Sequence, residues 1–373
     1  MSGGEPIKIL LALGIVTAVL SAFLDNVTTV LLIVPVTFAI TSQLKINVWP
    51  FLFTEILMSN IGGTATLIGD PPNIMIGSAT GLGFMDFALN LTPVIAVVAL
   101  VTIYLLQYIY RHQLDTTQEL KSKILLMNEQ DEIKDHALLR KCLVVLALTI
   151  LGFLLHQYVH LESSVIALSG ASLLLLVSGE EVEHALAAVE WPVLFFFIGL
   201  FVIIGALEEV GIIEAVAKWS LVATGGNMVP TGMLILWLSA IASAFVDNIP
   251  FVATMIPLIQ DMGRLGGIAD LNFLWWCLSL GACLGGNGTL IGASANVVVI
   301  GMAEKRGIRV TFIEFMKTAF PLMLVSVVIS TAYMLLWYFY GHLQAAVISL
   351  CIAAALAVLS RSINRWMLKG VKK

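Results

Sequence analysis

The sequence predicts an all-α polytopic membrane protein built from two inverted-topology repeats, and three observations support this fold class. Of the 373 residues, 59% are hydrophobic and only 12% are charged, and the mean hydropathy is +0.99. Globular domains carry about 25% charged residues, so this composition disfavours a soluble domain. Many apolar runs reach the roughly 20 residues that a helix needs to cross a bilayer. The third observation is a pair of polar phrases that each occur twice.

The repeated phrases interrupt apolar segments at matching places in the two halves of the chain. Ser21–Asn26 reads SAFLDN, and it returns 222 residues later as SAFVDN at Ser243–Asn248. A glycine-rich phrase, GGTATLIG, begins at Gly62 and returns 223 residues later as GGNGTLIG at Gly285. Paired interruptions of this kind are typical of inverted-repeat membrane proteins and mark the place where their binding sites lie.

Ten apolar segments are expected to form helices or broken helices. The Asp-Asn phrases divide two of them into re-entrant helical hairpins. The glycine-rich phrases, with Pro71-Pro72 after the first, divide two more into discontinuous helices. Backbone at these breaks needs cover from protein or water, because lipid offers no hydrogen-bond partner. The segments are 7–41, 51–79, 87–110, 138–158, 162–178, 191–207, 231–259, 273–302, 316–340 and 343–360.

These segments divide the chain into four parts. Residues 1–110 form the first repeat, 111–141 a polar linker, 142–342 the second repeat, and 343–373 an extra C-terminal helix with a basic tail. Three spans precede the hairpin of the second repeat and almost nothing precedes that of the first. The first repeat is therefore expected to be N-terminally incomplete. A misassigned start, a fragment and a natural deletion all fit this pattern.

The distribution of basic residues predicts the orientation in the membrane. The 111–141 linker holds six Lys or Arg residues and the C-terminal tail five more, and basic loops stay on the cytoplasmic side. Five spans then separate the two hairpins, an odd number, so the hairpins enter the membrane from opposite sides. We expect a multi-pass protein of the inner (cytoplasmic) membrane, with the linker and the C-terminus in the cytoplasm.

Carboxylates within apolar segments are costly and are therefore functional candidates. Asp25 and Asp247 are predicted to bind a coupling proton or cation; the alternative is that they only cap the second arm of each hairpin, and the two roles are compatible. Asp70 has Ala293 as its counterpart, so it either belongs to the site of one half or lies at a water-exposed mouth. Glu55 lacks an acidic counterpart and is either a proton relay or a residue at a helix end.

The candidate site combines carboxylates with amides, hydroxyls and glycine backbone groups. Amide and carbonyl oxygens suit a hard cation, and helix N-termini suit an anion. Na⁺ is expected near Asn26, Asn73, Asn248 and Asn296, and no cofactor is expected besides Na⁺ or H⁺ as the coupling ion. An enzyme is not expected, because neither HExxH nor GxSxG occurs in the sequence. The candidate ligands are Asp25, Asn26, Thr28, Thr29, Gly63, Thr64, Thr66, Asp70, Asn73, Asp247, Asn248, Gly286, Asn287, Thr289 and Asn296.

A family resemblance rests on these phrases and covers nearly the whole chain. Its residues are Ser21–Asn26 with Val27-Thr28-Thr29, Gly62–Asn73, Trp191–Gly205, Ser243–Asn248 and Gly285–Asn296. The chain resembles the arsenite permeases and NhaD-type sodium/proton antiporters, a branch of the ion transporter superfamily that includes citrate and dicarboxylate carriers and the melanosomal P protein. The resemblance implies two re-entrant hairpins, two broken helices, a homodimer and a substrate coupled to Na⁺ or H⁺. An arsenite-type member would also imply a soluble ATPase subunit as a partner.

The expected function is secondary active transport of an inorganic ion or small anion by alternating access. The Asp-Asn and glycine-rich phrases contain no Lys or Arg, which disfavours a bare anion. Dicarboxylate carriers place Ser-Asn-Thr at each hairpin tip where this chain has Asp25-Asn26-Val27-Thr28, which disfavours a dicarboxylate. Na⁺/H⁺ exchange, arsenite efflux and Na⁺-coupled uptake of a citrate-like anion stay open, as does a non-transporting fragment. The bilayer is the expected environment, and the net charge of −5 does not suggest a nucleic-acid partner.

Overall fold

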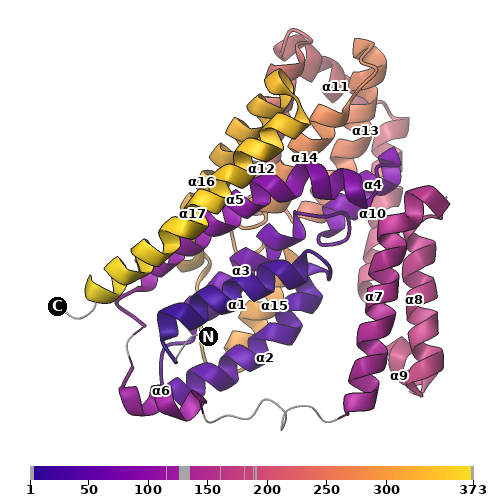
Figure 1. Ribbon diagram of the computed structural model, residues 1–373. Helices are drawn as coiled ribbons and strands as arrows, with labels where there is room; N and C mark the ends of the chain where they lie inside the picture. Colours follow the sequence, from indigo (N-terminus) through magenta and orange to yellow (C-terminus); the bar gives the residue numbers. More distant parts are fainter. Residues whose placement is uncertain are drawn as a thin grey trace.

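The computed structural model describes residues 4–114, 116–125, 135–159, 161–179, 181–187, 189 and 191–370, and all regular elements in these ranges are helices (Figure 1). Six of them are long and apolar enough to cross a membrane, or seven if one bent pair of helices counts as a single span. The predicted all-α polytopic membrane fold is therefore confirmed. Residues 126–134 of the predicted linker and 371–373 of the predicted tail lie outside the described residues.

The two repeats contain the same five helices in the same order: two arms of a hairpin, two halves of a broken helix, and one long helix. In the first repeat these are α1 (Pro6–Ser21), α2 (Asn26–Leu44), α3 (Trp49–Gly63), α4 (Pro71–Thr80) and α5 (Phe84–Tyr110). In the second repeat they are α12 (Met228–Phe245), α13 (Asn248–Gly266), α14 (Asn272–Gly285), α15 (Ser294–Glu304) and α16 (Phe312–Tyr340).

Each Asp-Asn phrase forms the tip of a hairpin and starts its second arm. Asp25 has an extended backbone, and its carboxylate accepts a hydrogen bond from the Thr28 backbone N–H, so it is the N-cap of α2. Asp247 caps α13 in the same way through the Ile249 N–H. The α1–α2 hairpin opens toward α6 at the lower left of Figure 1, and the α12–α13 hairpin opens toward α11 at the top. The hairpins therefore point in opposite directions, as an inverted repeat requires.

The two broken helices end at glycines because the hairpins pack unusually close to them. A Cβ on Gly62 would lie 2.1 Å from the carbonyl oxygen of Ala18 on α1, and one on Gly285 would lie 2.6 Å from that of Ala240 on α12. After the breaks, α4 restarts at Pro71 and Pro72, which fit the first turn of a helix. The glycines thus do more than weaken the helix, since they allow backbone-to-backbone contact.

The repeats interlock through reciprocal contacts. The second hairpin arm α2 packs on the half-helix α15 of the other repeat, and α13 packs on α4 in the same manner. The two first halves, α3 and α14, contact each other directly. Almost every residue of α3 and α14 is buried. The centre of the molecule is therefore shared by both repeats and lies where the hairpin tips and helix breaks meet.

The remaining helices surround this centre. They are α6 (Gln118–Leu125), α7 (His136–Val159), α8 (Ser163–Ser178), α9 (Val182–Ala187), α10 (Trp191–Glu209), α11 (Ile212–Ala223) and α17 (His342–Gly370). Figure 1 shows α7 and α8 as a pair at one side of the body, and α17 lies along α5. The predicted spans 138–158, 162–178 and 191–207 correspond to α7, α8 and α10.

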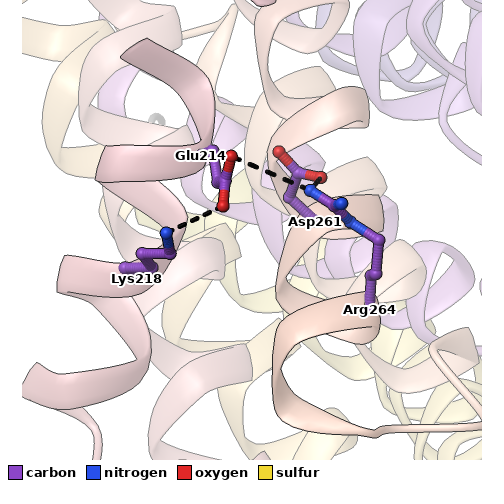
Figure 2. A network of polar contacts seen from close by, with 4 residues as sticks. All are labelled: Glu214, Lys218, Asp261 and Arg264. Carbon is purple, nitrogen blue, oxygen red and sulfur yellow. Dashed lines mark hydrogen bonds and ion pairs between the residues drawn. The ribbon is translucent and has the colours of Figure 1, made fainter. Parts of the chain in front are cut away.

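Helix α11 was not among the predicted segments. It bends by 67° from α10 and packs on α13. Figure 2 shows the polar contacts of this packing: Arg264 of α13 lies 2.8 Å from Asp261 and 4.0 Å from Glu214 of α11. Glu214 also pairs with Lys218 at 2.8 Å. These side chains are partly or largely exposed, so water and salt screen the pairs and each contributes little to stability.

Candidate functional site

Asp70 joins the tips of both hairpins. Its side chain is fully buried, and its Oδ1 accepts hydrogen bonds from Asn26 Nδ2 and Asn248 Nδ2, both at 3.4 Å. These two amides are the first residues of α2 and α13, so one carboxylate contacts the equivalent residue of each repeat. Asp70 Oδ2 is buried and has no hydrogen-bond partner in the described part of the chain. Asp70 is thus buried between the two hairpin tips and does not lie at a water-exposed mouth.

A second buried residue, Asn60 of α3, extends this centre into the second repeat. It accepts a hydrogen bond from Asn26 Nδ2 at 3.0 Å and donates to Asn287 Oδ1 and Asn296 Oδ1, both at 2.9 Å. Asn287 in turn donates to the Leu57 carbonyl at 3.3 Å. Sequence reasoning missed Asn60 because its counterpart in the repeat is Cys283 and no repeated phrase marks it. An amide inside an apolar segment was the signal that could have found it.

The paired residues Asn73 and Asn296 hold the irregular segments after α3 and α14. Asn73 Nδ2 donates to the carbonyls of Thr64 and Thr66 at 3.1 and 2.9 Å. Asn296 Nδ2 donates to those of Gly286 and Thr289 at 2.8 and 2.9 Å. Several of the carbonyls freed by the helix breaks are therefore already bonded within the protein.

The side-chain oxygens of Asn73 and Asn296 contact the opposite repeat. Asn73 Oδ1 accepts hydrogen bonds from Ser279 Oγ at 2.5 Å and from Cys283 Sγ at 3.6 Å. Asn296 Oδ1 accepts the bond from Asn60, which is the residue equivalent to Cys283. Each broken helix is thus tied to its own loop and to the other repeat by one asparagine.

The predicted hydroxyl ligands have backbone partners or none. Thr64 Oγ1 donates to Asn60 O at 2.7 Å, Thr66 Oγ1 to Ala22 O at 2.5 Å, and Thr289 Oγ1 to Ala244 O. The Thr66 and Thr289 bonds are equivalent and fix each hairpin to its broken helix. Thr29 Oγ1 is buried and has no partner in the described residues. Gly63 and Gly286 lie against the carbonyls of Gly69 and Gly292, where the broken helices end.

The two aspartates of the hairpin tips make the capping contacts that the alternative interpretation predicted. Asp25 accepts from Thr28 N at 2.7 Å and from the exposed Thr28 Oγ1 at 2.9 Å. Asp247 accepts from Ile249 N at 3.0 Å. Both aspartates are only partly buried. The structure places Asp70, and neither of these residues, between Asn26 and Asn248.

The chemistry of this centre is a single buried carboxylate among amides and helix N-termini. Helices α2, α13, α4 and α15 all begin here, and the positive ends of their dipoles favour a negative charge. No Lys, Arg or His side chain of the described residues takes part in the hydrogen bonds reported above. An ionised Asp70 would supply that negative charge itself. Asp70 Oδ2 and Asn26 Oδ1, which have no hydrogen-bond partner in the described residues, offer acceptors to a cation or a proton.

Two inverted repeats that meet at a buried polar centre in a multi-pass helical protein define a membrane transporter. Residues 1–281 match the model of the citrate transporter family, and the chain belongs to that family. The expected membership of the wider superfamily is thereby confirmed. The arsenite-permease and NhaD-type branch stays a prediction.

Similar proteins agree with this class. The chain is 43% identical over 337 residues to an uncharacterised transporter from Mycobacterium bovis. The aligned region covers 90% of this chain and 78% of the relative. It is 41% identical over 338 residues to a 46 kDa membrane protein from Mycobacterium leprae, with 90% and 79% covered. It is 34% identical over 413 residues to the human P protein, with 90% of this chain and 49% of the relative covered.

Proposed function

We propose that this protein is a secondary active transporter that moves an inorganic ion or small anion by alternating access, with H⁺ or Na⁺ as the coupling ion. The observation that carries the proposal is the contact of both hairpin tips with Asp70. Because the hairpins point in opposite directions, withdrawing either tip would open the centre toward a different side of the membrane. A site held by both tips can then be exposed to one side at a time.

Asp70 is the proposed coupling residue. A carboxylate buried without a cationic partner is costly, so the site gains stability when a proton or a cation joins it. Asn26 and Asn248 contact the same carboxylate oxygen and would sense whether that oxygen is occupied. Asp25 and Asp247, at the tips, would attract cations to the centre.

The substrate that we favour is an arsenite-type oxyanion or Na⁺. The site has amides and no basic side chain among its hydrogen-bonded groups, which suits a cation, or an anion that travels with one. The family model favours a second candidate, a Na⁺-coupled carrier of a citrate-like carboxylate, whose oxygens would accept from the asparagine amides and the helix N-termini. The two candidates share the coupling site and differ in the ion that it accompanies.

The test is a transport assay with purified protein in liposomes. Uptake of citrate, uptake of arsenite and Na⁺/H⁺ exchange are measured separately, each with imposed Na⁺ and pH gradients. We expect one of these fluxes to depend on a gradient, and the isosteric substitution Asp70→Asn to abolish that dependence. A flux that Asp70→Asn leaves unchanged would rule out the coupling role, and an absence of all three fluxes would rule out the proposed substrates.

The assembly and orientation of the protein complete the proposal. We propose a homodimer in the inner membrane with residues 111–141 and the C-terminus in the cytoplasm. A soluble ATPase subunit is proposed only for the arsenite-type substrate. Cysteine labelling from either side of intact cells tests the orientation, and mass measurement of the detergent-solubilised protein tests the dimer.

A further inference from the structure

Glu55 is a second buried acid, separate from the hydrogen bonds around Asp70. It lies in the middle of α3, so the sequence-based alternative of a helix-end residue does not apply. Its side chain has no exposed surface, Thr37 Oγ1 of α2 donates to its Oε1, and its Oε2 has no partner in the described residues. An uncompensated carboxylate at such a position costs several kcal/mol, and the neutral acid costs much less.

Buried hydroxyl groups accompany Glu55 on one face of α2. The buried residues of α2 recur at helical spacing and include Asn26, Thr29, Thr37 and Thr41, the last of which lies about one turn before the end of the helix at Leu44. Thr41 Oγ1 donates to the Thr37 carbonyl at 2.7 Å. Thr37 and Thr41 therefore lie between Glu55 and the open end of the first hairpin, whereas the buried face between Thr29 and Thr37 is apolar and includes Ile33.

The second repeat has neither these hydroxyl groups nor the acid. The offsets of 222 and 223 residues align Thr29 with Phe251, Thr37 with Ile259, Thr41 with Gly263, and Glu55 with Leu278. The flanking prolines, Pro35 and Pro257, and the first residues, Asn26 and Asn248, are kept in both copies. Packing of a hairpin arm against a broken helix therefore does not require an acid or hydroxyls at these positions. Their presence in one copy needs a functional reason.

Glu55 has no charged partner on the helices that pack against α3, which are α1, α2, α5, α14 and α15. Helix α2 has no ionisable residue. None of those on the other four helices forms a hydrogen bond or ion pair with Glu55: Lys8 on α1, Asp86, Tyr104, Tyr108 and Tyr110 on α5, Cys277 and Cys283 on α14, and Glu304 on α15. A proton is the one positive charge that this position can hold without further ligands.

We propose that Glu55 is a proton-binding site that loads from the open end of the first hairpin along Thr37 and Thr41, and that it makes the protein proton-coupled. A proton arriving on Thr37 Oγ1 from water would let Thr37 pass its own hydrogen to Glu55 Oε1, which leaves a neutral hydroxyl and a neutral carboxylic acid. Thr37 and Asn26 lie on the same helix, about 16 Å apart along its axis. The protonation state of Glu55 would therefore act on the hairpin tip through the position of α2.

This inference rests on the proposed transport function and names H⁺ as its coupling ion. Its first test is the isosteric variant Glu55→Gln, which mimics the protonated acid. In liposomes we expect Glu55→Gln to lose accumulation driven by a pH gradient, with citrate, arsenite and Na⁺ tested in turn. Exchange of the same ion across membranes of equal pH is expected to persist. Accumulation equal to that of the unmodified protein would overturn the inference.

The Thr37 contact is tested with a matched pair of variants. Thr37→Val removes the donor to Glu55 and is expected to lower pH-driven accumulation. Thr54→Val is the control, because Thr54 is equally buried, lies next to Glu55 in α3 and bonds only to the Pro50 carbonyl of its own helix. Equal effects of the two substitutions would show a packing defect and contradict the relay role of Thr37.

Infrared spectroscopy measures the protonation of Glu55 without a transport assay. We expect the protein to show a protonated carboxyl band that is absent in Glu55→Gln and still present in Asp70→Asn. If the protein carries no flux at all, the proposed function fails, while this band still decides whether Glu55 holds a proton. A spectrum that Glu55→Gln leaves unchanged would overturn the inference even where transport is observed.

Discussion

The first and second repeats fix their hairpins with the same hydrogen bonds but carry different acids. Ser21 Oγ donates to the Ser59 carbonyl at 2.6 Å in the first repeat, and Ser243 Oγ donates to the Ala282 carbonyl at 2.7 Å in the second. In contrast, Asp70 is matched by Ala293. These equivalent bonds from a side chain to a backbone carbonyl, which we call the frame, are thus duplicated. The acids that we assign to coupling, Asp70 and Glu55, belong to the first copy.

The difference shows which parts of a duplicated membrane fold are free to change. The frame bonds end on backbone carbonyls, so the side chain at the accepting position is unconstrained, as the pair Ser59 and Ala282 shows. The donors and the glycines at close contacts cannot change without losing the frame. We infer that one copy could gain acids while both copies kept equivalent movements, which gives a carrier one set of coupling groups for two gates.

The largest effect on stability is expected at the equivalent positions Asn60 and Cys283. Asn60→Ala leaves the buried oxygens of Asn287 and Asn296 without their donor, at a cost of about 1–3 kcal/mol each. Cys283→Ala removes only a weak S–H donor, and Asn73 keeps its bond from Ser279, so we expect a cost of less than about 1 kcal/mol. Thermal unfolding in detergent measures both. Equal losses would show that the cross-repeat contacts are symmetric in energy as well as in position.

An intermediate effect is expected where each hairpin touches its broken helix. Gly62→Ala places a Cβ 2.1 Å from a backbone oxygen, and Gly285→Ala places one at 2.6 Å, so both variants are overpacked by about 1–3 kcal/mol, with the greater loss at Gly62. Gly301→Ala is the control, because this α15 glycine has nothing within 4 Å and alanine favours a helix. A loss at Gly301 as large as at Gly62 would contradict the close-contact explanation.

The sequence predicted the hairpins and broken helices of both repeats well, because the phrases that mark them occur in both copies. The two Asp-Asn phrases and the two glycine-rich phrases mark the hairpin tips and helix breaks, which the structure has at Asn26, Asn248, Gly63 and Gly285. The phrases could not show that Asn73 and Asn296 reach across to the other repeat. These contacts depend on how the two repeats pack against each other, and the sequence of one repeat does not contain that information.

Residues that occur in one copy only were harder to assign. Asp70 stood out as a break in symmetry, yet its contact with both hairpin tips required the three-dimensional arrangement. Asn60 was missed because a single amide has no repeat to mark it. Helix α11 was missed for a different reason: its Glu214 and Lys218 make it less apolar than a span, and it is held by packing on α13.

The smallest effect on stability is expected at Asp25 and Asp247, which cap equivalent helices. Asn is as good an N-cap as Asp, so Asp25→Asn and Asp247→Asn should change stability by less than about 0.5 kcal/mol, whereas Asp25→Ala should cost about 1 kcal/mol. With the caps intact, any loss of gradient-driven flux reports the missing charge. We expect such a loss in both asparagine variants, since both aspartates are placed to draw cations toward Asp70. Unchanged flux with unchanged stability would mean that Asp25 and Asp247 only cap their helices. Coupling would then belong to Asp70 and Glu55 alone.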